Sequence, residues 1–281
     1  MADMGLSGTV PGFKLTRLEE RFRRAPRDIR RAHRHDYYKM GLVIGGRARL
    51  SLDFNDHSIR APMLFQFGPG VVHAWQSGEL PRGYVLNFEP NFLGEAAHDR
   101  AEITEAPVFC LHSGPRVLAL TSEQRSVFEP LANAIGREYE SRGKDHLAAL
   151  RSYLRIWLIE ANRIAEAQKP ARWNDRGTAL TNRFLCLMGE NFRTLSAVSD
   201  YAARLQVTAS HLNETVRRTM QKTAGQVIRD RMLLEAKRLL RHSDLSVSEV
   251  AYHLNFEDPS YFARFFRKLT GQAPAEFRAL P

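Results

Sequence analysis

Apolar residues recur at helical spacing in three consecutive segments near the C-terminus. The first, Asp230–Arg241, places leucine and alanine every three or four residues, which is typical of one buried helix face. In the second, Ser246 is a favourable N-cap and Glu249 stands three residues later, as in a capping box. The third begins at Asp258 or Pro259 and repeats phenylalanine on one side. A short helix, a tight turn and a second helix predict a helix-turn-helix.

The same pattern occurs once more upstream. Leu195–Leu205 resembles the supporting helix, and Thr208 is a suitable N-cap for a second helix over Ala209–Met220. The two copies are offset by 49 residues before the turn and by 50 after it, as these apolar positions show: Ala202, Leu205, Leu212 and Val216 against Ala251, Leu254, Phe262 and Phe266. A period near 50 predicts two helix-turn-helix units over residues 178–281, joined by a connecting helix.

A longer pattern lies between Ala236 and Arg278. It reads A-x-x-L-L, then S-x-x-E-V-A-x-x-L-x-F-x-D-P-S-Y-F-x-R-x-F-R-K, and then G-x-x-P-x-x-F-R. This pattern resembles the signature of the AraC/XylS family of bacterial transcription regulators, with fixed spacing over about forty positions. Asn255 departs from it, because the family usually has glycine in this turn. Since Asn tolerates positive φ better than most residues, we expect the turn to be kept.

The resemblance implies which side chains contact DNA. Base edges in the major groove would be read by donors and acceptors of the two recognition helices: Ser210, Asn213, Glu214, Ser260, Tyr261 and Arg264. Cations near the ends of these helices would contact phosphates: Arg217, Arg218, Lys222, Arg267 and Lys268. An alternative for Glu214 is an ion pair within its own helix, with Arg217 or Arg218.

Residues 32–120 have the texture of β-structure. Short apolar or alternating runs, separated by Gly, Pro or Asn-Asp, predict these strands: Tyr38–Ile44, Arg47–Phe54, His57–Arg60, Met63–Phe67, Val71–Trp75 and Tyr84–Phe88. Gly45-Gly46 predicts a hairpin between the first two. The order H-x-H, strand, G-G, strand, P-G-x-x-H resembles the cupin-type sensory domain that AraC/XylS regulators carry. The predicted fold is therefore α+β in two domains, with a cupin-like β-barrel and two helices before an all-α domain.

This first domain is expected to bind a small-molecule effector. Aromatic walls and a few polar anchors would line the pocket: Phe65, Phe67, Trp75 and Tyr84, with His33, His35, His73 and Arg47. Such a lining favours an aromatic or other organic acid. The alternative is that the aromatic residues only fill the core of the barrel.

The three histidines also raise the question of a metal, because cupin enzymes use such residues as ligands. The carboxylate of a cupin metal site would fall at or near Lys39, and a protonated amine cannot be a ligand. We therefore expect no metal and no other cofactor. Two amphipathic helices follow over residues 121–168, and the resemblance supports dimerisation through the second: Leu147, Leu150, Leu154, Trp157, Leu158 and Ala161. The alternative is that both helices pack on the barrel.

Composition and charge indicate a polyanionic partner and a cellular compartment. The net charge is +10 over 281 residues, which favours nucleic acid as a partner. Only Cys110 and Cys186 are present, which does not indicate disulfides or a zinc ribbon, and no signal or membrane-spanning pattern occurs, so we expect a cytoplasmic protein. Residues 1–31 are interpreted as a solvated basic arm, with an arm that folds over a ligand or onto the DNA-binding half as the alternative. Residues 169–177 are interpreted as a linker.

These patterns together predict a sequence-specific, effector-controlled transcription regulator rather than an enzyme. It would be a homodimer on promoter DNA, contact RNA polymerase and activate a catabolic operon. Two alternatives remain at this point. One is a metal-dependent cupin enzyme with an appended basic domain, and the other is a DNA-binding protein whose N-terminal half only oligomerises.

Overall fold

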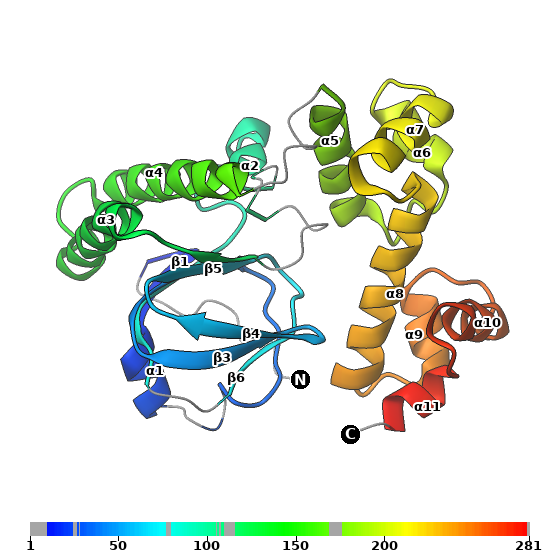
Figure 1. Cartoon of the computed structure of the whole chain (residues 1–281), viewed down its shortest axis with the longest axis horizontal. Helices are drawn as coiled ribbons and strands as arrows, with labels where there is room; N and C mark the ends of the chain where they lie inside the picture. The colour runs from blue at the N-terminus through cyan, green and yellow to red at the C-terminus, as the bar shows by residue number, and fades with distance from the viewer. Residues whose placement is uncertain are drawn as a thin grey trace. The chain divides into compact units, whose positions relative to one another are not determined.

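The chain forms two compact units, residues 2–169 and residues 170–281 (Figure 1). The computed structural model describes residues 10–24, 27, 29–76, 80–104, 106, 108–109, 116–168 and 176–279. No helix within these ranges is long and apolar enough to cross a bilayer.

The first unit is built from two antiparallel sheets. Its strands are β1 (Phe13–Arg17), β2 (Tyr38–Gly45), β3 (Arg47–Leu52), β4 (Asn55–Arg60), β5 (Met63–Phe67), β6 (His73–Gln76), β7 (Arg82–Phe88) and β8 (Arg116–Ala119). One sheet has the order β1-β7-β2-β5-β8 and the other the order β4-β3-β6. The α+β class with two domains is confirmed, and the strands of the expected cupin-like β-barrel form two sheets rather than one closed sheet.

The glycine pair at the end of β2, Gly45-Gly46, does not make the expected hairpin. Strand β2 pairs with β5 and β7, whereas β3 pairs with β4 and β6. Gly46, at φ +85°, therefore carries the chain from one sheet to the other. A Cβ at this position would lie 2.4 Å from the carbonyl oxygen of Leu80, so only glycine fits the close approach.

The described part of the expected basic arm belongs to the fold. Strand β1 pairs with β7 along its whole length, and Phe13 is buried. Helix α1 (Leu18–Arg24) buries Leu18 against the residues that lie between the two sheets. The prediction of a solvated arm is therefore wrong for these residues. The many arginines of the segment indicated exposure, but several apolar residues among them are buried in the fold. Residues 1–9 lie outside the described part of the chain.

Helices cover one face of the five-stranded sheet. They are α2 (Ala97–Thr104), α3 (Ser122–Ser141) and α4 (His146–Ala167). This sheet contributes to two cores, one beneath the helices and one between the two sheets. Neighbouring residues of a strand point into different cores: Leu42 of β2 packs with the helices, and Val43 packs between the sheets.

This packing corrects the predicted dimer interface. Five of its six residues are buried in the core of their own unit: Leu150, Leu154, Trp157, Leu158 and Ala161. The ring of Trp157 meets that of Phe128 of α3 edge to face, with 5.1 Å between centroids. Leu147 is partly buried and packs against the same core. The apolar stripe of α4 thus packs on α3 and the sheet, which was the alternative considered for it.

The second unit is all-helical. It contains α5 (Arg176–Asn191), α6 (Val198–Arg204), α7 (Ala209–Met220), α8 (Ala224–His242), α9 (Val247–His253), α10 (Pro259–Thr270) and α11 (Pro274–Ala279). Helices α6 and α7 form the first helix-turn-helix and α9 and α10 the second, with α8 between them, as predicted. Of the expected linker, residues 169–175 lie outside the described residues, and Arg176 and Gly177 belong to α5.

Candidate DNA-binding surface and histidine cluster

Local hydrogen bonds set the ends of both recognition helices. Thr208 accepts a hydrogen bond from the backbone N–H of His211 at the start of α7, at 3.1 Å. Asp258 accepts one from Ser260 N–H at the start of α10, at 2.8 Å, and this bond lowers the pKa of its carboxyl group. Each helix ends in a left-handed residue, Gln221 at φ 60° and Gly271 at φ 79°. The two helices are therefore capped in equivalent ways, although only the second has the usual glycine.

The turns within the two helix-turn-helix units are also equivalent. Asn255 has φ 62°, as expected from its tolerance of this conformation, and Gln206 occupies the matching position at φ 57°. Small buried residues, Ala202 and Ala251, stand on the supporting helices α6 and α9. The recognition helices bury Leu212 and Val216 in the first copy, and Phe262 and Phe266 in the second. Their opposite faces remain open to solvent.

Most of the predicted base-reading residues lie on these open faces. Ser210, Glu214, Ser260, Tyr261 and Arg264 are exposed, and Tyr261 keeps 59% of its surface accessible. The predicted phosphate contacts are exposed as well: Arg217, Arg218, Lys222, Arg267 and Lys268. His211 is a further exposed residue, and the 50-residue offset between the copies gives it the position of Tyr261. The repeat alone could therefore have identified His211 as a candidate base contact.

Asn213 is different from the other predicted base contacts. Its side-chain carbonyl oxygen accepts a hydrogen bond from the backbone N–H of Ala224, at 2.9 Å, at the first turn of α8. Asn213 is only partly exposed, and Ala263 takes its place in the second copy. The structure therefore uses Asn213 to join the recognition helix to the connecting helix, a long-range contact that the sequence pattern does not reveal.

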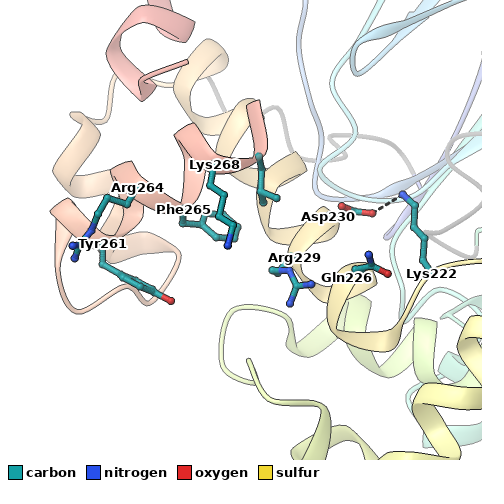
Figure 2. Close-up of a pocket in the computed structure, with 9 residues that line it drawn as sticks. Lys222, Gln226, Arg229, Asp230, Tyr261, Arg264, Phe265 and Lys268 are labelled. Carbon is teal, nitrogen blue, oxygen red and sulfur yellow. Dashed lines mark hydrogen bonds and ion pairs between the residues drawn. The ribbon is translucent and has the colours of Figure 1, made fainter. Parts of the chain in front are cut away.

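A cationic cleft lies between the start of α8 and one side of α10 (Figure 2). It has a volume of about 850 Å³ and is lined by Lys222, Gln226, Arg229, Asp230, Tyr261, Arg264, Phe265, Lys268 and Leu269. The ammonium of Lys222 is paired with the carboxylate of Asp230 at 2.6 Å. Four cations against one carboxylate make this cleft suitable for a phosphate backbone. Arg229 and Gln226 were not predicted, because they lie on the connecting helix.

The structure does not bring all eight predicted effector-binding residues together. Six of the eight lie together between the sheets: His33, His35, His73, Phe65, Phe67 and Trp75. The ring of His73 lies 4.2 Å from that of His33 and 4.6 Å from that of Phe67, between centroids. Phe65, Phe67 and Trp75 belong to the core between the sheets, which was the alternative considered for them.

Tyr84 and Arg47 do not join this group. Tyr84 lies on the helix-facing side of β7, donates a hydrogen bond to Asn133 of α3, and has the guanidinium of Arg17 4.0 Å from its ring centroid. It lines a cleft of about 500 Å³ with Lys14, Arg17, Arg24, Arg137, Glu20 and Glu140, among others. Arg47 is exposed at the start of β3. The prediction that these two residues share a pocket with the histidines is therefore wrong.

Burial disfavours the charged forms of His35 and His73. Burial, and next the charge of Lys39, lowers the pKa of His35 to about 2. The same causes hold the pKa of His73 well below its usual range. Burial, with a smaller effect of Arg21, also lowers the pKa of Lys39, whose Nζ lies 2.7 Å from Nε2 of His73. Neutral imidazoles present lone pairs, so this cluster suits a Lewis acid or a hydrogen-bond donor better than an anion.

Comparison with known proteins covers both units. A family model for an AraC-like ligand-binding domain matches residues 18–151, and a model for a helix-turn-helix domain matches residues 201–280. The HTH-type transcriptional activator RhaR of Salmonella dublin is 24% identical over 263 residues, which cover 92% of this chain and 90% of the relative. RhaR of Salmonella choleraesuis is 25% identical over the same shares. The crystal structure of ToxT from Vibrio cholerae O395 aligns over 95% of this chain and 97% of its own, at 13% identity and a TM-score of 0.42.

Each family model thus falls within one structural unit, and the helix-turn-helix model begins within α6 and extends past both recognition helices. The chain belongs to the AraC family of transcription regulators, with an AraC-like ligand-binding domain followed by a helix-turn-helix DNA-binding domain.

Proposed function

We propose that this regulator inserts α7 and α10 into successive major-groove faces of promoter DNA, about 34 Å apart, one turn of the duplex. The observation that carries the proposal is the equivalence of the two helices, which are capped alike and both expose polar faces. Base readers in the first copy are Ser210 and Glu214, together with His211. In the second copy they are Ser260, Tyr261 and Arg264, of which Arg264 can pair with guanine in a bidentate manner.

Phosphate contacts fix the register of the protein on the duplex. We assign this role to the exposed cations at the ends of the recognition helices: Arg217, Arg218, Lys222, Arg267 and Lys268. The cleft lined by Lys222, Arg229 and Lys268 supports a path for the backbone between the two grooves. The pairing of Lys222 with Asp230 would then be exchanged for a phosphate on binding.

The proposed effector is an aromatic or other organic acid that binds in the cleft beside Tyr84. Its volume, about 500 Å³, lies within the range typical of small-molecule sites, about 300–1,000 Å³. Lys14, Arg17, Arg24 and Arg137 outnumber Glu20 and Glu140 in its lining, which favours an anion. Screening organic acids and sugars by thermal shift tests this: Arg17→Ala should abolish the response to an acid, while Arg60→Ala, at an exposed arginine of β4, should keep it.

We propose further that the protein acts in the cytoplasm as an activator of a catabolic operon, through contact with RNA polymerase. The relatives named as activators support this, as does the sensor-like first domain. A homodimer is part of the proposal. Since five of the six earlier interface residues are buried, we assign the contact with a second copy to Ile156 and Ile159, two exposed apolar side chains of α4.

The decisive test is selective DNA binding by the purified chain. Fluorescence anisotropy at moderate salt should give a higher affinity for a promoter fragment near the coding region than for scrambled duplex, and an effector should change it. Transcription in vitro with RNA polymerase then separates activation from repression. Equal affinity for promoter and scrambled duplex, with and without effectors, would contradict the proposal.

A further inference from the structure

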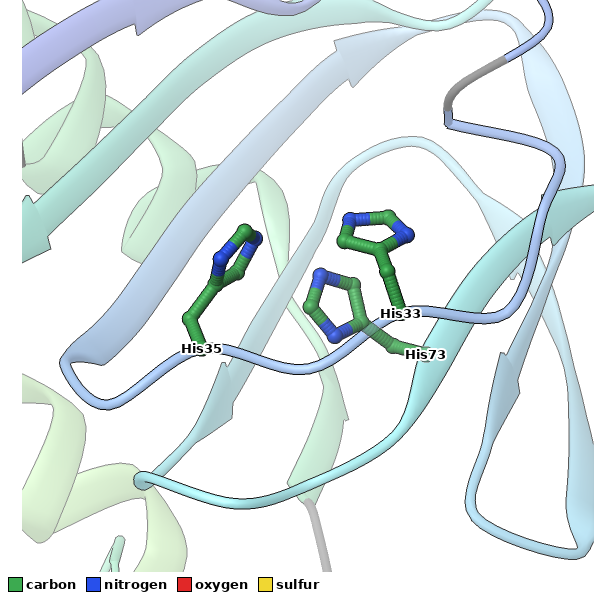
Figure 3. Close-up of side chains that lie close together, drawn as sticks. All are labelled: His33, His35 and His73. Carbon is green, nitrogen blue, oxygen red and sulfur yellow. The ribbon is translucent and has the colours of Figure 1, made fainter. Parts of the chain in front are cut away.

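Backbone pairing holds the histidine cluster together. His33 and His73 form a β-bridge, with N–O distances of 3.1 Å and 2.8 Å in the two directions. His35 follows two residues later on the same segment, and its carbonyl oxygen accepts a hydrogen bond from Gly70 N–H at 2.8 Å. One nitrogen from each ring lies within 4.8 Å of the others (Figure 3). The three rings are therefore brought together by main-chain contacts that do not depend on any ligand.

Backbone carbonyl oxygens fix the tautomers of two of the rings. Nδ1 of His33 lies 2.8 Å from the carbonyl oxygen of Arg31, and Nδ1 of His73 lies 3.1 Å from that of Val71. Because a carbonyl oxygen only accepts, both Nδ1 atoms carry hydrogen and each Nε2 keeps a lone pair. Histidines that bind metals are held in this way, with the second ring nitrogen donating to a backbone carbonyl or carboxylate.

His35 supplies an independent observation. It is buried, and neither of its ring nitrogens has a hydrogen-bond partner among the described residues. Buried polar atoms that lack partners are unfavourable and uncommon in native proteins. A bound cation would satisfy one of these nitrogens and would explain why a histidine, rather than an apolar residue, occupies the position.

We propose that His33, His35 and His73 bind a divalent transition metal of the zinc type. Imidazoles suit zinc, copper, nickel and cobalt, whereas magnesium and calcium prefer oxygen ligands. Three histidines are a sufficient protein ligand set for zinc, and they leave one position open. We predicted no metal from the sequence because Lys39 replaces the carboxylate ligand of a cupin metal site. A zinc site of three histidines does not require that carboxylate. On binding, the metal takes Nε2 of His73 and displaces the amine of Lys39 from it.

Metal binding by the full chain, without DNA, tests this proposal separately from the proposed function. After chelation and dialysis, calorimetry with zinc chloride should give one equivalent per chain, and cobalt should give visible d–d absorption bands. Removing a ligand should weaken binding by more than about a hundredfold, which exceeds the usual effect of a supporting residue. His35→Ala and His33→Ala should both show this loss, whereas His98→Ala, at an exposed histidine elsewhere in the domain, should not.

The second ligand variant guards against misfolding of the first, because His33 is only partly buried. Circular dichroism of the stripped variants should match that of the stripped wild type. Less than stoichiometric binding by the folded wild-type chain would overturn the proposal. So would equal losses in His33→Ala and His98→Ala, since these would indicate scattered surface binding.

Discussion

Arg264 offers the sharpest test of a single base contact. Its guanidinium is exposed on α10 and lies 5.9 Å from the centroid of the Tyr261 ring. A bidentate contact with guanine discriminates by about 1–3 kcal/mol, and an exposed cation–π contact is worth about 0.5–1 kcal/mol. Because the base contact replaces part of the ring contact, Arg264→Ala should weaken binding to the specific site by about 1–2 kcal/mol, or about 5–30-fold.

Anisotropy titrations on the preferred site, on single-base variants of it and on random duplex measure this effect. Arg264→Ala should relax preference at one base pair and leave random binding nearly unchanged. Lys268→Ala should weaken binding to all DNA alike and reduce the slope of log affinity against log salt by about 0.9. Arg183→Ala, at an exposed arginine of α5, controls for the lost charge. If Arg264→Ala weakened specific and random binding equally, its role as a base reader would be refuted.

Three further predictions concern Asn213, helix α4 and His35. Asn213→Ala should lower the free energy of unfolding of the DNA-binding domain by about 1 kcal/mol in urea titrations while keeping base preference, and a changed preference would restore its role as a base reader. Leu154→Ala should lower the free energy of unfolding of the first domain by about 2–5 kcal/mol, because Leu154 is buried, whereas Ile159→Ala should lower it by about 0.5 kcal/mol or less. A small loss of stability in Leu154→Ala together with loss of the dimer would restore the earlier interface. Because the pKa of His35 is lowered to about 2 when folded, stability should fall by up to about 1.4 kcal/mol per pH unit as pH drops below about 6.5, and His35→Gln should flatten this dependence in melts of the metal-free chain.

Features fixed by neighbouring residues could be predicted from the sequence. The capping box of Ser246 and Glu249 and the left-handed Asn255 both depend on atoms only a few residues apart. The repeat of the helix-turn-helix was equally readable, since its period does not depend on tertiary packing. Gln221 adopts at the end of α7 the left-handed cap that Gly271 provides at the end of α10, so the repeat holds even where the residue type differs.

Features fixed by distant contacts were missed. The apolar stripe of α4 was recognised, but periodicity cannot say whether a second copy or the chain's own sheet covers it. Tyr84 and Val85 are adjacent in sequence yet face opposite sides of β7. Tyr84 therefore faces the helices and not the histidines, and only the strand pairing shows which of the two faces it takes. The order of the histidines was visible in sequence, but their bridge and tautomers depend on strand pairing.

The most direct measurement is selection of binding sites from a random duplex pool by the purified chain. Two recognition helices on one domain should select two short blocks of fixed bases, with centres about ten base pairs apart. Inserting five base pairs between the blocks should then reduce affinity to that of one block alone, because the second helix would face the opposite side of the duplex. Selection of a single block, or no selection at all, would contradict insertion of both helices.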